Sequence, residues 1–375
     1  MKNLLQTLLI LFISTSSLAQ LEWESRKSIP QYGRHGGISF EINGKIYVGL
    51  GRRADAAFLA DFWEYDPNDD SWTRKADFPG GARFGSSGFA VNGKGYVCLG
   101  YSSAAVSQSD LYEYNPTSNS WASKASFPAT ARYSAKCFVI GDTAYVGTGS
   151  CGGPTCYQQD LWAYIPSSNS WLQRANWPGG NRSDVVAFNL GQFGIVGNGT
   201  STSRAASSNF YKYNPTTNSW ASIAPIPGVA KRLTSGFSLN GVGYVGCGRN
   251  SGTAFITFYN TFHSYDPTTN VWTTKNVNAN YSERIDPQMV TIGDSVVYSI
   301  GGYSLEESLS ENWVWSISQD TCDYYDTTFV QDTLFINDTT FTTIFDTSYI
   351  QIEDTLIVYK LDTIEVYVID TFYRT

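Results

Sequence analysis

Residues 62–72 read FWEYDPNDDSW, and this stretch decides the fold because close copies of it recur along the chain. The copies are LYEYNPTSNSW at 111–121, LWAYIPSSNSW at 161–171, FYKYNPTTNSW at 210–220 and FHSYDPTTNVW at 262–272. Their final tryptophans are spaced 49, 50, 49 and 52 residues apart, and Trp23 stands 49 residues before the first. A period of about 50 residues indicates a repeat architecture, in which each unit is one supersecondary motif.

Each repeat reads as four short strands. In the first unit, residues 38–42 and 45–50 flank Asn43-Gly44, a dipeptide typical of a hairpin turn. A third strand at 62–65 ends at Asp66-Pro67, a turn dipeptide, and a fourth covers 71–75. Four strands per unit, six units and no helical periodicity predict an all-β protein, a six-bladed β-propeller.

The two ends of the repeat region complement each other. The last unit has candidate strands at 289–291, 295–300 and 313–317 but lacks a fourth. Residues 21–27, which include Trp23, form a fourth strand without the preceding three. We therefore predict that the N-terminal strand completes the C-terminal blade, which removes an exposed sheet edge.

The repeat resembles the kelch family, whose unit combines a glycine pair, a Tyr-x-Pro turn and a tryptophan. The glycine positions here are Leu50-Gly51, Leu99-Gly100, Thr148-Gly149, Asn198-Gly199, Cys247-Gly248 and Gly301-Gly302, so only the last is a true pair. The resemblance covers about residues 21–317. It implies a propeller whose ligand pocket is made by loops and inner-strand entries at one end, here called the mouth.

The chain begins with a secretory signal peptide over residues 1–19. Lys2 precedes an apolar run, and Ser17-Leu18-Ala19 fits a cleavage site. No other segment approaches 18 apolar residues, so no transmembrane segment is expected. We expect an exported protein that is secreted or lies at the cell surface, in an extracytoplasmic compartment of the Gram-negative type.

Residues 318–375 have a different composition from the propeller region at 20–317. Of the chain's 33 acidic and 25 basic side chains, they hold 11 acidic and two basic ones, so the net charge of −8 comes from this tail. Asp-Thr recurs there at even spacings, from Asp320 to Asp370. The tail resembles the Asp-Thr-rich stalks of secreted Bacteroidetes proteins, which implies a spacer and cell-surface attachment through a C-terminal module beyond it. The neutral propeller excludes an ordinary nucleic-acid binder.

The numbers and spacing of the cysteines and histidines limit which disulfides and metal sites the chain can form. Six cysteines suit an oxidising compartment, and Cys151 and Cys156 enclose a short loop that a disulfide can close. Neither a second close cysteine pair nor a nearby histidine completes a zinc site. With only two histidines in the chain, we predict no metal site and no cofactor.

A basic register repeats at the entry to each innermost strand, and it has two interpretations. Its members are Arg34, Arg83, Arg132, Arg182, Lys231 and Arg284. Six cations around one rim would form an anion-attracting mouth. Alternatively, they are interblade struts that bond carbonyls or carboxylates, and the recurring Asp61, Asp110 and Asp160 are then their partners.

A second register follows each glycine position and supplies the candidate ligand-binding loops. Its members are Arg52, Tyr101, Ser150, Thr200, Arg249 and Tyr303. Loops on a rigid scaffold commonly carry recognition because the scaffold tolerates change in them. Their mixed chemistry suits a specific protein or glycan better than a symmetric ion site.

We therefore expect an exported binding module that recognises an extracellular protein or glycan at the mouth. Catalytic motifs are mostly absent. The two histidines, His35 and His263, sit at different positions of their repeats and do not match the copper site of galactose oxidase, and neither the sialidase Ser-x-Asp-x-Gly-x-Thr-Trp box nor a G-x-S-x-G elbow occurs. This favours a protein that is not an enzyme, and no catalytic residue is predicted. One alternative is a carbohydrate-active enzyme such as a kelch-type sialic acid mutarotase, since a basic mouth suits a carboxylated sugar. Another is a structural adhesion or matrix protein.

Overall fold

A computed structural model describes residues 21–153, 156–251, 255–305 and 307–316, together with the backbone of short strands between 333 and 356. The chain divides into two compact units, 1–317 and 318–375. The predicted signal peptide and most of the Asp-Thr tail lie outside the described residues. In the second unit, β27 (Thr333–Ile336) pairs with β28 (Thr339–Thr342), and β29 (Gln351–Ile352) pairs with β30 (Thr355–Leu356).

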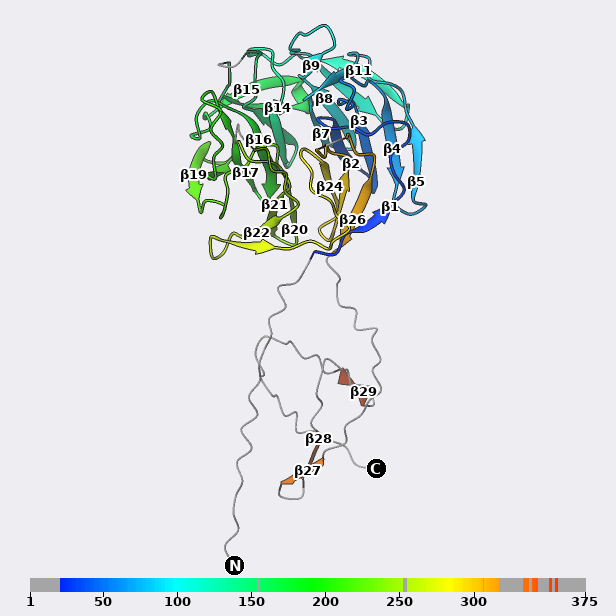
Figure 1. Cartoon of the computed structure of the whole chain (residues 1–375). Coiled ribbons are helices and arrows are strands. Elements are labelled where there is room, and N and C mark those ends of the chain that lie inside the picture. The colour runs from blue at the N-terminus through cyan, green and yellow to red at the C-terminus, as the bar shows by residue number, and fades with distance from the viewer. Residues whose placement is uncertain are drawn as a thin grey trace, which may run out of the picture. The chain divides into compact units, whose positions relative to one another are not determined.

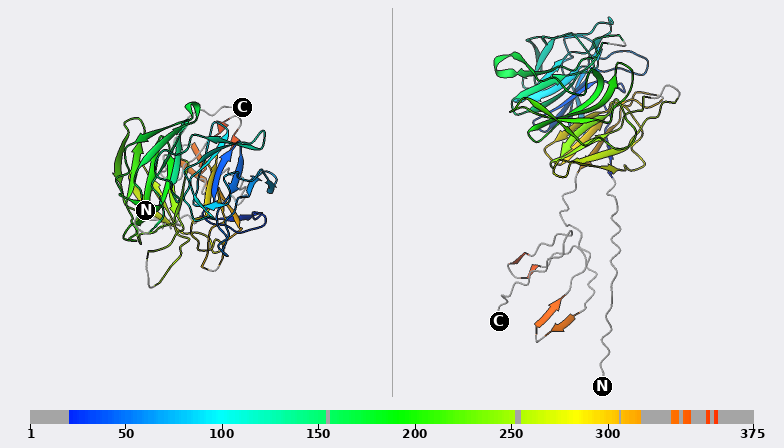
Figure 2. Two further views of the ribbon diagram at one scale, coloured as in Figure 1. Left: turned by 90° about the horizontal axis from the view of Figure 1, so that it is seen from above. Right: turned by 90° about the vertical axis from the view of Figure 1, so that its left-hand side faces the viewer.

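The first unit is a six-bladed β-propeller, as predicted (Figures 1 and 2). Among the described residues, six antiparallel four-stranded sheets follow one another around a ring. Blade 1 contains β2 (Ile38–Ile42), β3 (Lys45–Gly49), β4 (Phe62–Asp66) and β5 (Ser71–Arg74); blade 2 contains β7 (Ser87–Val91), β8 (Lys94–Cys98), β10 (Leu111–Asn115) and β11 (Ser120–Lys124); blade 3 contains β12 (Lys136–Ile140), β13 (Thr143–Gly147), β14 (Leu161–Ile165) and β15 (Ser170–Arg174).

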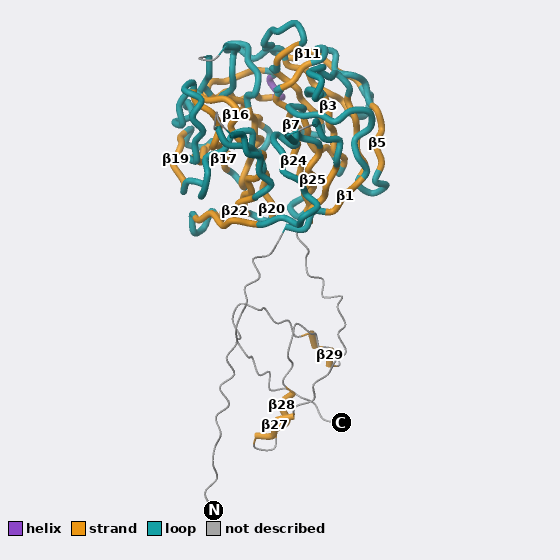
Figure 3. Tube along the Cα trace, viewed as in Figure 1, coloured by secondary structure: helices purple, strands orange, loops and turns teal. Residues whose placement is uncertain are grey.

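The second half of the ring repeats this plan. Blade 4 contains β16 (Arg182–Leu190), β17 (Phe193–Ser201), β18 (Phe210–Asn214) and β19 (Ser219–Ile223); blade 5 contains β20 (Ser235–Leu239), β21 (Val242–Gly246), β22 (Phe262–Asp266) and β23 (Val271–Lys275); blade 6 contains β24 (Gln288–Ile292), β25 (Val296–Ile300), β26 (Asn312–Ser316) and β1 (Glu24–Arg26). Loops and strands make up nearly all of the described chain (Figure 3), with one short 3₁₀ helix at Pro166–Ser168. Among the described residues, no helix is long and apolar enough to span a membrane.

The N-terminal strand closes the ring, which confirms the predicted closure. Blue β1 lies beside orange β26 in Figure 1, and Glu24 pairs with Val314 in an antiparallel register. Trp23 is buried, and its ring stacks on Tyr281 with ring centroids 4.8 Å apart. The side-chain amide of Asn278 accepts from the backbone N–H of Trp23 at 3.3 Å and donates to the backbone carbonyl of Trp23 at 2.8 Å. The two ends of the repeat region are therefore joined by backbone pairing, aromatic packing and side-chain hydrogen bonds.

The repeated tryptophan explains why the same motif recurs in each unit. In blade 2, the Trp121 indole donates to the carbonyl of Ala76, which follows the outer strand of blade 1, at 2.9 Å. Asn119 accepts from the Tyr114 hydroxyl and from the Ala76 N–H, both at 2.9 Å. The tyrosine, the tryptophan and the asparagine (Asp70 in the first motif) of each motif thus hold the neighbouring blade as well as their own.

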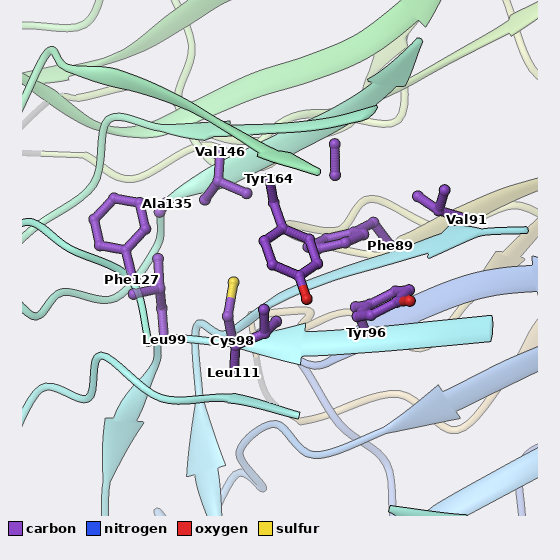
Figure 4. Packing of buried hydrophobic residues seen from close by; sticks show 11 residues of the cluster. Phe89, Val91, Tyr96, Cys98, Leu99, Leu111, Phe127, Ala135, Val146 and Tyr164 are labelled. Carbon is purple, nitrogen blue, oxygen red and sulfur yellow. The ribbon is translucent and has the colours of Figure 1, made fainter. Parts of the chain in front are cut away.

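The hydrophobic core lies between consecutive blades. Figure 4 shows the cluster between blades 2 and 3, where Phe89, Tyr96 and Cys98 of one sheet face Val146 and Tyr164 of the next. The Phe89 and Tyr96 rings stack with centroids 5.2 Å apart, and the edge of Tyr164 meets Tyr96 at 5.6 Å. Because every sheet face is covered by its neighbour, the inner strands are rigid supports for the groups at the mouth.

Candidate functional site

The basic register is mostly buried and paired with carboxylates, so it does not form an anion-attracting mouth. Arg34 is 0% exposed and donates to both oxygens of Asp61, at 2.8 and 2.7 Å. The same two-oxygen pairing joins Arg83 to Asp110 and Arg132 to Asp160, and Arg284 donates to one oxygen of Glu311 at 2.7 Å. These four guanidinium groups offer no free charge to a ligand, and this corrects the first interpretation of the register.

These arginines connect two blades in a way that differs from the strut interpretation. The side chain of Arg83 pairs with Asp110 inside its own blade. The backbone of Arg83 instead bonds the preceding blade, accepting from the Gly51 N–H at 2.9 Å and donating to the Leu59 carbonyl at 3.1 Å. The interblade link is therefore made by the main chain, and the side chain fixes the main chain in place.

Arg182 and Lys231 depart from this pattern because blades 4 and 5 lack the acid. Asn209 and Thr261 stand where the other blades have Asp or Glu. Arg182 donates to the carbonyls of Gly179, Gly199 and Ala205. The Lys231 ammonium, buried and without a carboxylate partner among the described residues, lies 4.6 Å from the centre of the Tyr259 ring. Burial lowers the pKa of Lys231.

The second register divides into exposed and buried members. Arg52, Tyr101, Arg249 and Tyr303 are partly exposed at the mouth, whereas Ser150 and Thr200 are only 2% and 1% exposed. Ser150 and Thr200 therefore support the fold and do not meet a ligand directly. Each member of this second register forms a β-pair with the residue one position after a member of the basic register. Examples are Arg52 with His35 and Arg249 with Arg232. This inner partner position was missed by the sequence analysis.

An aromatic band lines the mouth over blades 1 to 3. It consists of Phe58, Phe84, Tyr101 and Tyr133, all partly exposed. Successive rings touch, with centroid distances of 5.1 Å for Phe58–Phe84, 5.5 Å for Phe84–Tyr133 and 5.1 Å for Tyr101–Tyr133. The Arg52 guanidinium lies 5.9 Å from the centres of both the Phe58 and the Phe84 ring. Of this band, only Tyr101 was a sequence candidate.

Blade 5 places two arginines side by side at the mouth. Arg232 and Arg249 exchange both backbone hydrogen bonds at 3.0 Å, so their side chains lie directly opposite each other. Arg232 contacts the Asp184 carboxylate at 3.3 Å, and no ion pair of Arg249 occurs among the described residues. Like charges in this arrangement repel, so the pair favours an anionic neighbour. Burial raises the pKa of Asp184, Arg232 opposes the rise, and Asp286 adds to it.

The floor of the mouth is a collar of six residues with left-handed backbone. They are Gly36, Gly85, Ser134, Asp184, Leu233 and Asp286, with φ between 50° and 66°. Backbone hydrogen bonds run from residue to residue, for example from Gly85 to Gly36 and from Ser134 to Gly85, both at 2.7 Å. At position 36 the left-handed φ of 60° and a Cβ that would lie 3.3 Å from the Phe84 ring disfavour a side chain, although Ser134, Asp184, Leu233 and Asp286 adopt the same backbone conformation. The collar brings Asp184 and Asp286 to the axis.

An ion pair crosses the axis beneath the collar. Lys136 of blade 3 contacts Asp286, which precedes the inner strand of blade 6, at 3.2 Å. Both line a polar cavity of about 120 Å³ that inner strands of all six blades surround, with Ser39, Ser87 and Ser235 among its hydroxyl groups. Because these two blades face each other across the ring, the pair bars the channel and gives the mouth a floor.

The structure also bears on the cysteines and on metal-binding groups. Cys151 and Cys156 form a disulfide with their Cα atoms 5.3 Å apart, whereas Cys98, Cys137 and Cys247 are free. Among the described residues, no group of three or more His, Cys, Asp and Glu side chains is arranged to hold a metal ion.

The comparisons with known proteins agree with the fold. No protein-family model matches this sequence, and no curated protein matches it either. Among solved structures, the one titled "Structure of YjhT" is similar, with a TM-score of 0.68 and 18% sequence identity. The similarity covers 78% of this chain and 97% of that chain. At this identity the likeness establishes the six-bladed β-propeller fold and nothing finer.

Proposed function

We propose that this protein is an exported kelch-type propeller that binds a carbohydrate at its mouth. The observation that carries the proposal is the aromatic band, a run of touching, partly exposed rings at the mouth. Binding sites of this kind combine apolar and aromatic walls with a few placed polar groups. Aromatic side chains bury a large apolar surface at little cost in conformational entropy, and Tyr adds a hydroxyl for hydrogen bonding.

Charged groups opposite the band supply orientation and specificity. Arg52 lies against two of its rings, and Arg232, Arg249 and Asp184 form the facing wall. We expect a sugar ring placed against the band to turn its hydroxyl or acidic substituents toward these charged groups. Export and cell-surface attachment belong to the same proposal, and they rest on the signal-peptide pattern and on the Asp-Thr tail.

The test is a glycan array probed with the full chain and with two variants. Tyr101→Ala/Tyr133→Ala removes half of the band and is expected to weaken binding at least about 10-fold, since stacked aromatic anchors contribute more than 1 kcal/mol each. The control is Phe193→Ala. Phe193 is also partly exposed and lies against Lys212 at 4.7 Å, but it begins β17 at the end of blade 4 far from the mouth. Equal glycan retention by all three proteins contradicts the proposal.

A second candidate is a carbohydrate-active enzyme of the mutarotase type acting on a carboxylated sugar. The observation in its favour is Asp184, a carboxyl whose pKa burial raises, beside the Arg232–Arg249 pair. A carboxylic acid of raised pKa can pass a proton to and from a sugar oxygen, while the arginines hold the carboxylate. Exchange between sialic acid anomers, followed by NMR, tests this candidate. Turnover that Asp184→Asn leaves unchanged excludes Asp184 as the proton carrier.

A further inference from the structure

Ring closure brings a serine and a histidine together at the mouth. His35 follows Arg34 at the entry to the inner strand of blade 1, and Ser308 lies in the blade 6 loop between β25 and β26. The His35 Nδ1 and the Ser308 Oγ are 3.1 Å apart, although 273 residues separate them along the chain. A hydroxyl within hydrogen-bond reach of an imidazole is the arrangement of an activated nucleophile and its base.

The backbone around this pair is tightly held. Gly33 passes so close to the Ser308 backbone that any side chain at 33 would collide with it. The Arg34 N–H donates to the Leu309 carbonyl at 3.0 Å, which joins the two blades beside the pair. The His35 ring lies against Tyr303, with centroids 4.9 Å apart. Backbone contacts between blades 1 and 6 therefore hold the two groups close to each other.

The charges around His35 suit a base. Burial lowers the pKa of His35, with the Asp286 carboxylate opposing this shift and Arg52 adding to it, so the imidazole is neutral at pH 7. In the Nε2–H tautomer, Nδ1 accepts the Ser308 proton. The Ser308 hydroxyl also lies within 3.5 Å of the Arg52 carbonyl, to which it can donate, and the Arg52 guanidinium lies against the aromatic band.

We propose that Ser308 is a nucleophile activated by His35, and that the mouth cleaves acyl esters carried on the hydroxyl groups of a carbohydrate. The acyl-ester class follows from the serine–histidine pair, which transfers acyl groups in many unrelated folds. The carbohydrate part rests on the proposed function, because it depends on ligand binding against the aromatic band.

The reaction balances with water as the only co-reactant. The Ser308 Oγ forms a bond to the ester carbon, its proton passes to His35, and the carbonyl electron pair moves onto oxygen. The tetrahedral intermediate collapses, the bond to the sugar oxygen breaks, and that oxygen takes the proton from His35. Water then attacks the acyl-serine in the same manner, which releases the carboxylic acid and restores Ser308.

Blade 2 supplies a matched control. Ser107 bridges Tyr101 as Ser308 bridges Tyr303, so the two serines occupy the same position in their blades. The Ser107 hydroxyl is buried and has no hydrogen-bond partner among the described residues. Position 84, which corresponds to 35, holds phenylalanine.

The first experiment treats the full chain with a fluorophosphonate probe and maps the adduct by mass spectrometry. We expect one adduct, on Ser308, lost in Ser308→Ala and unchanged in Ser107→Ala. His35→Gln should slow labelling about 10²-fold, the usual contribution of a general base. Melting temperatures of the variants check that they fold. No adduct, an adduct elsewhere, or a labelling rate that His35→Gln leaves unchanged would overturn the nucleophile.

The second experiment separates this proposal from the binding proposal. Acetate release is measured from p-nitrophenyl acetate and from an O-acetylated oligosaccharide. Tyr101→Ala/Tyr133→Ala should raise the KM for the acetylated sugar about 10-fold, whereas the control Ser107→Ala should leave both this KM and the fluorophosphonate labelling rate unchanged. Labelling of Ser308 without preference for the sugar ester overturns the carbohydrate part alone, while sugar binding without labelling overturns the nucleophile and leaves the binding proposal intact.

Discussion

The buried pair of Arg34 and Asp61 offers the most direct test of what holds each blade together. Arg34 is fully buried, and Asp61, 7% exposed, accepts from both guanidinium nitrogens and from the Trp63 indole at 2.7 Å. Asp61→Ala removes all three hydrogen bonds and leaves a buried cation whose remaining acceptor is the Leu50 carbonyl at 3.3 Å. Breaking one side of a buried ion pair costs about 3–5 kcal/mol.

That free energy sets the expected change in melting temperature. For domains somewhat smaller than this propeller, each kcal/mol lowers the melting temperature by about 2–4 °C, so Asp61→Ala should melt about 10 °C below wild type. The control is Asp77→Ala, which breaks the exposed Arg74–Asp77 pair, with side chains 47% and 52% exposed. An exposed pair contributes at most about 1 kcal/mol, so this variant should melt within about 3 °C of wild type.

A third variant identifies the unpaired charge as the cause. Arg34→Met/Asp61→Leu replaces both partners by apolar side chains of similar size and should recover most of the loss, because it leaves no uncompensated charge. Differential scanning calorimetry at one scan rate compares the four proteins. If Asp61→Ala melts within about 2 °C of wild type, the ion pair does not stabilise the blade. The same conclusion follows if the double variant melts below Asp61→Ala.

The same pair contributes a pH dependence whose sign can be worked out. Burial by itself would raise the pKa of Asp61, but the hydrogen bonds and charge of Arg34 outweigh it and lower the pKa. The folded state therefore binds fewer protons than the unfolded state just below the ordinary Asp pKa of about 3.9, and the stabilisation is lost as the pH falls through the folded pKa. The gap in melting temperature between wild type and Asp61→Ala should narrow below about pH 4.

Three further predictions follow from the closure and from blade 5. Deleting residues 21–28 removes β1 and the buried Trp23. Because truncating a buried tryptophan to alanine alone costs about 3–5 kcal/mol, the melting temperature of the deletion variant, measured by calorimetry, should fall by more than about 10 °C. An unchanged melting temperature would contradict a stabilising role for β1. Lys231→Arg/Thr261→Asp rebuilds the pair of the other blades and should raise the melting temperature by about 3–6 °C, whereas Lys231→Arg alone should not. The pKa of His263 is lowered to about 4 by burial and by Lys231. Since the unfolded value is about 6.5, stability should fall by about 3 kcal/mol as the pH drops through this window, and urea titrations of His263→Gln should show a flatter dependence.

The architecture could be predicted because its information is local and repeated. Alternation within each strand, the Asn-Gly and Asp-Pro turns and the spacing of Trp72, Trp121 and their equivalents are all short-range patterns. Even the closure by β1 followed from counting strands in the first and last units. The structure added the reason for the repeat, since the indoles of Trp72, Trp121, Trp171, Trp220 and Trp272 each donate to a carbonyl that follows the outer strand of the preceding blade.

The candidate site was predicted only in part because its chemistry depends on which side chains meet. Arg34 and Arg52 look alike in the sequence, yet one is buried against Asp61 and the other lies partly exposed beside aromatic rings. Phe84 and Tyr133 were overlooked, although each follows a member of the basic register by one residue and a search at that offset would have found them.

The sequence by itself therefore determined the six-bladed propeller, its closure by the N-terminal strand and the confinement of the net negative charge to the tail. Only the tertiary structure decided that the arginine register supports the blades, that Lys136 and Asp286 bar the channel, and that His35 meets Ser308. The physical reason is the sequence distance over which each kind of interaction acts. Periodicity and turn chemistry act between near neighbours, whereas the charge and reactivity of a side chain are set by partners that folding brings from 27 residues away for Arg34 and Asp61 and from 273 residues away for His35 and Ser308.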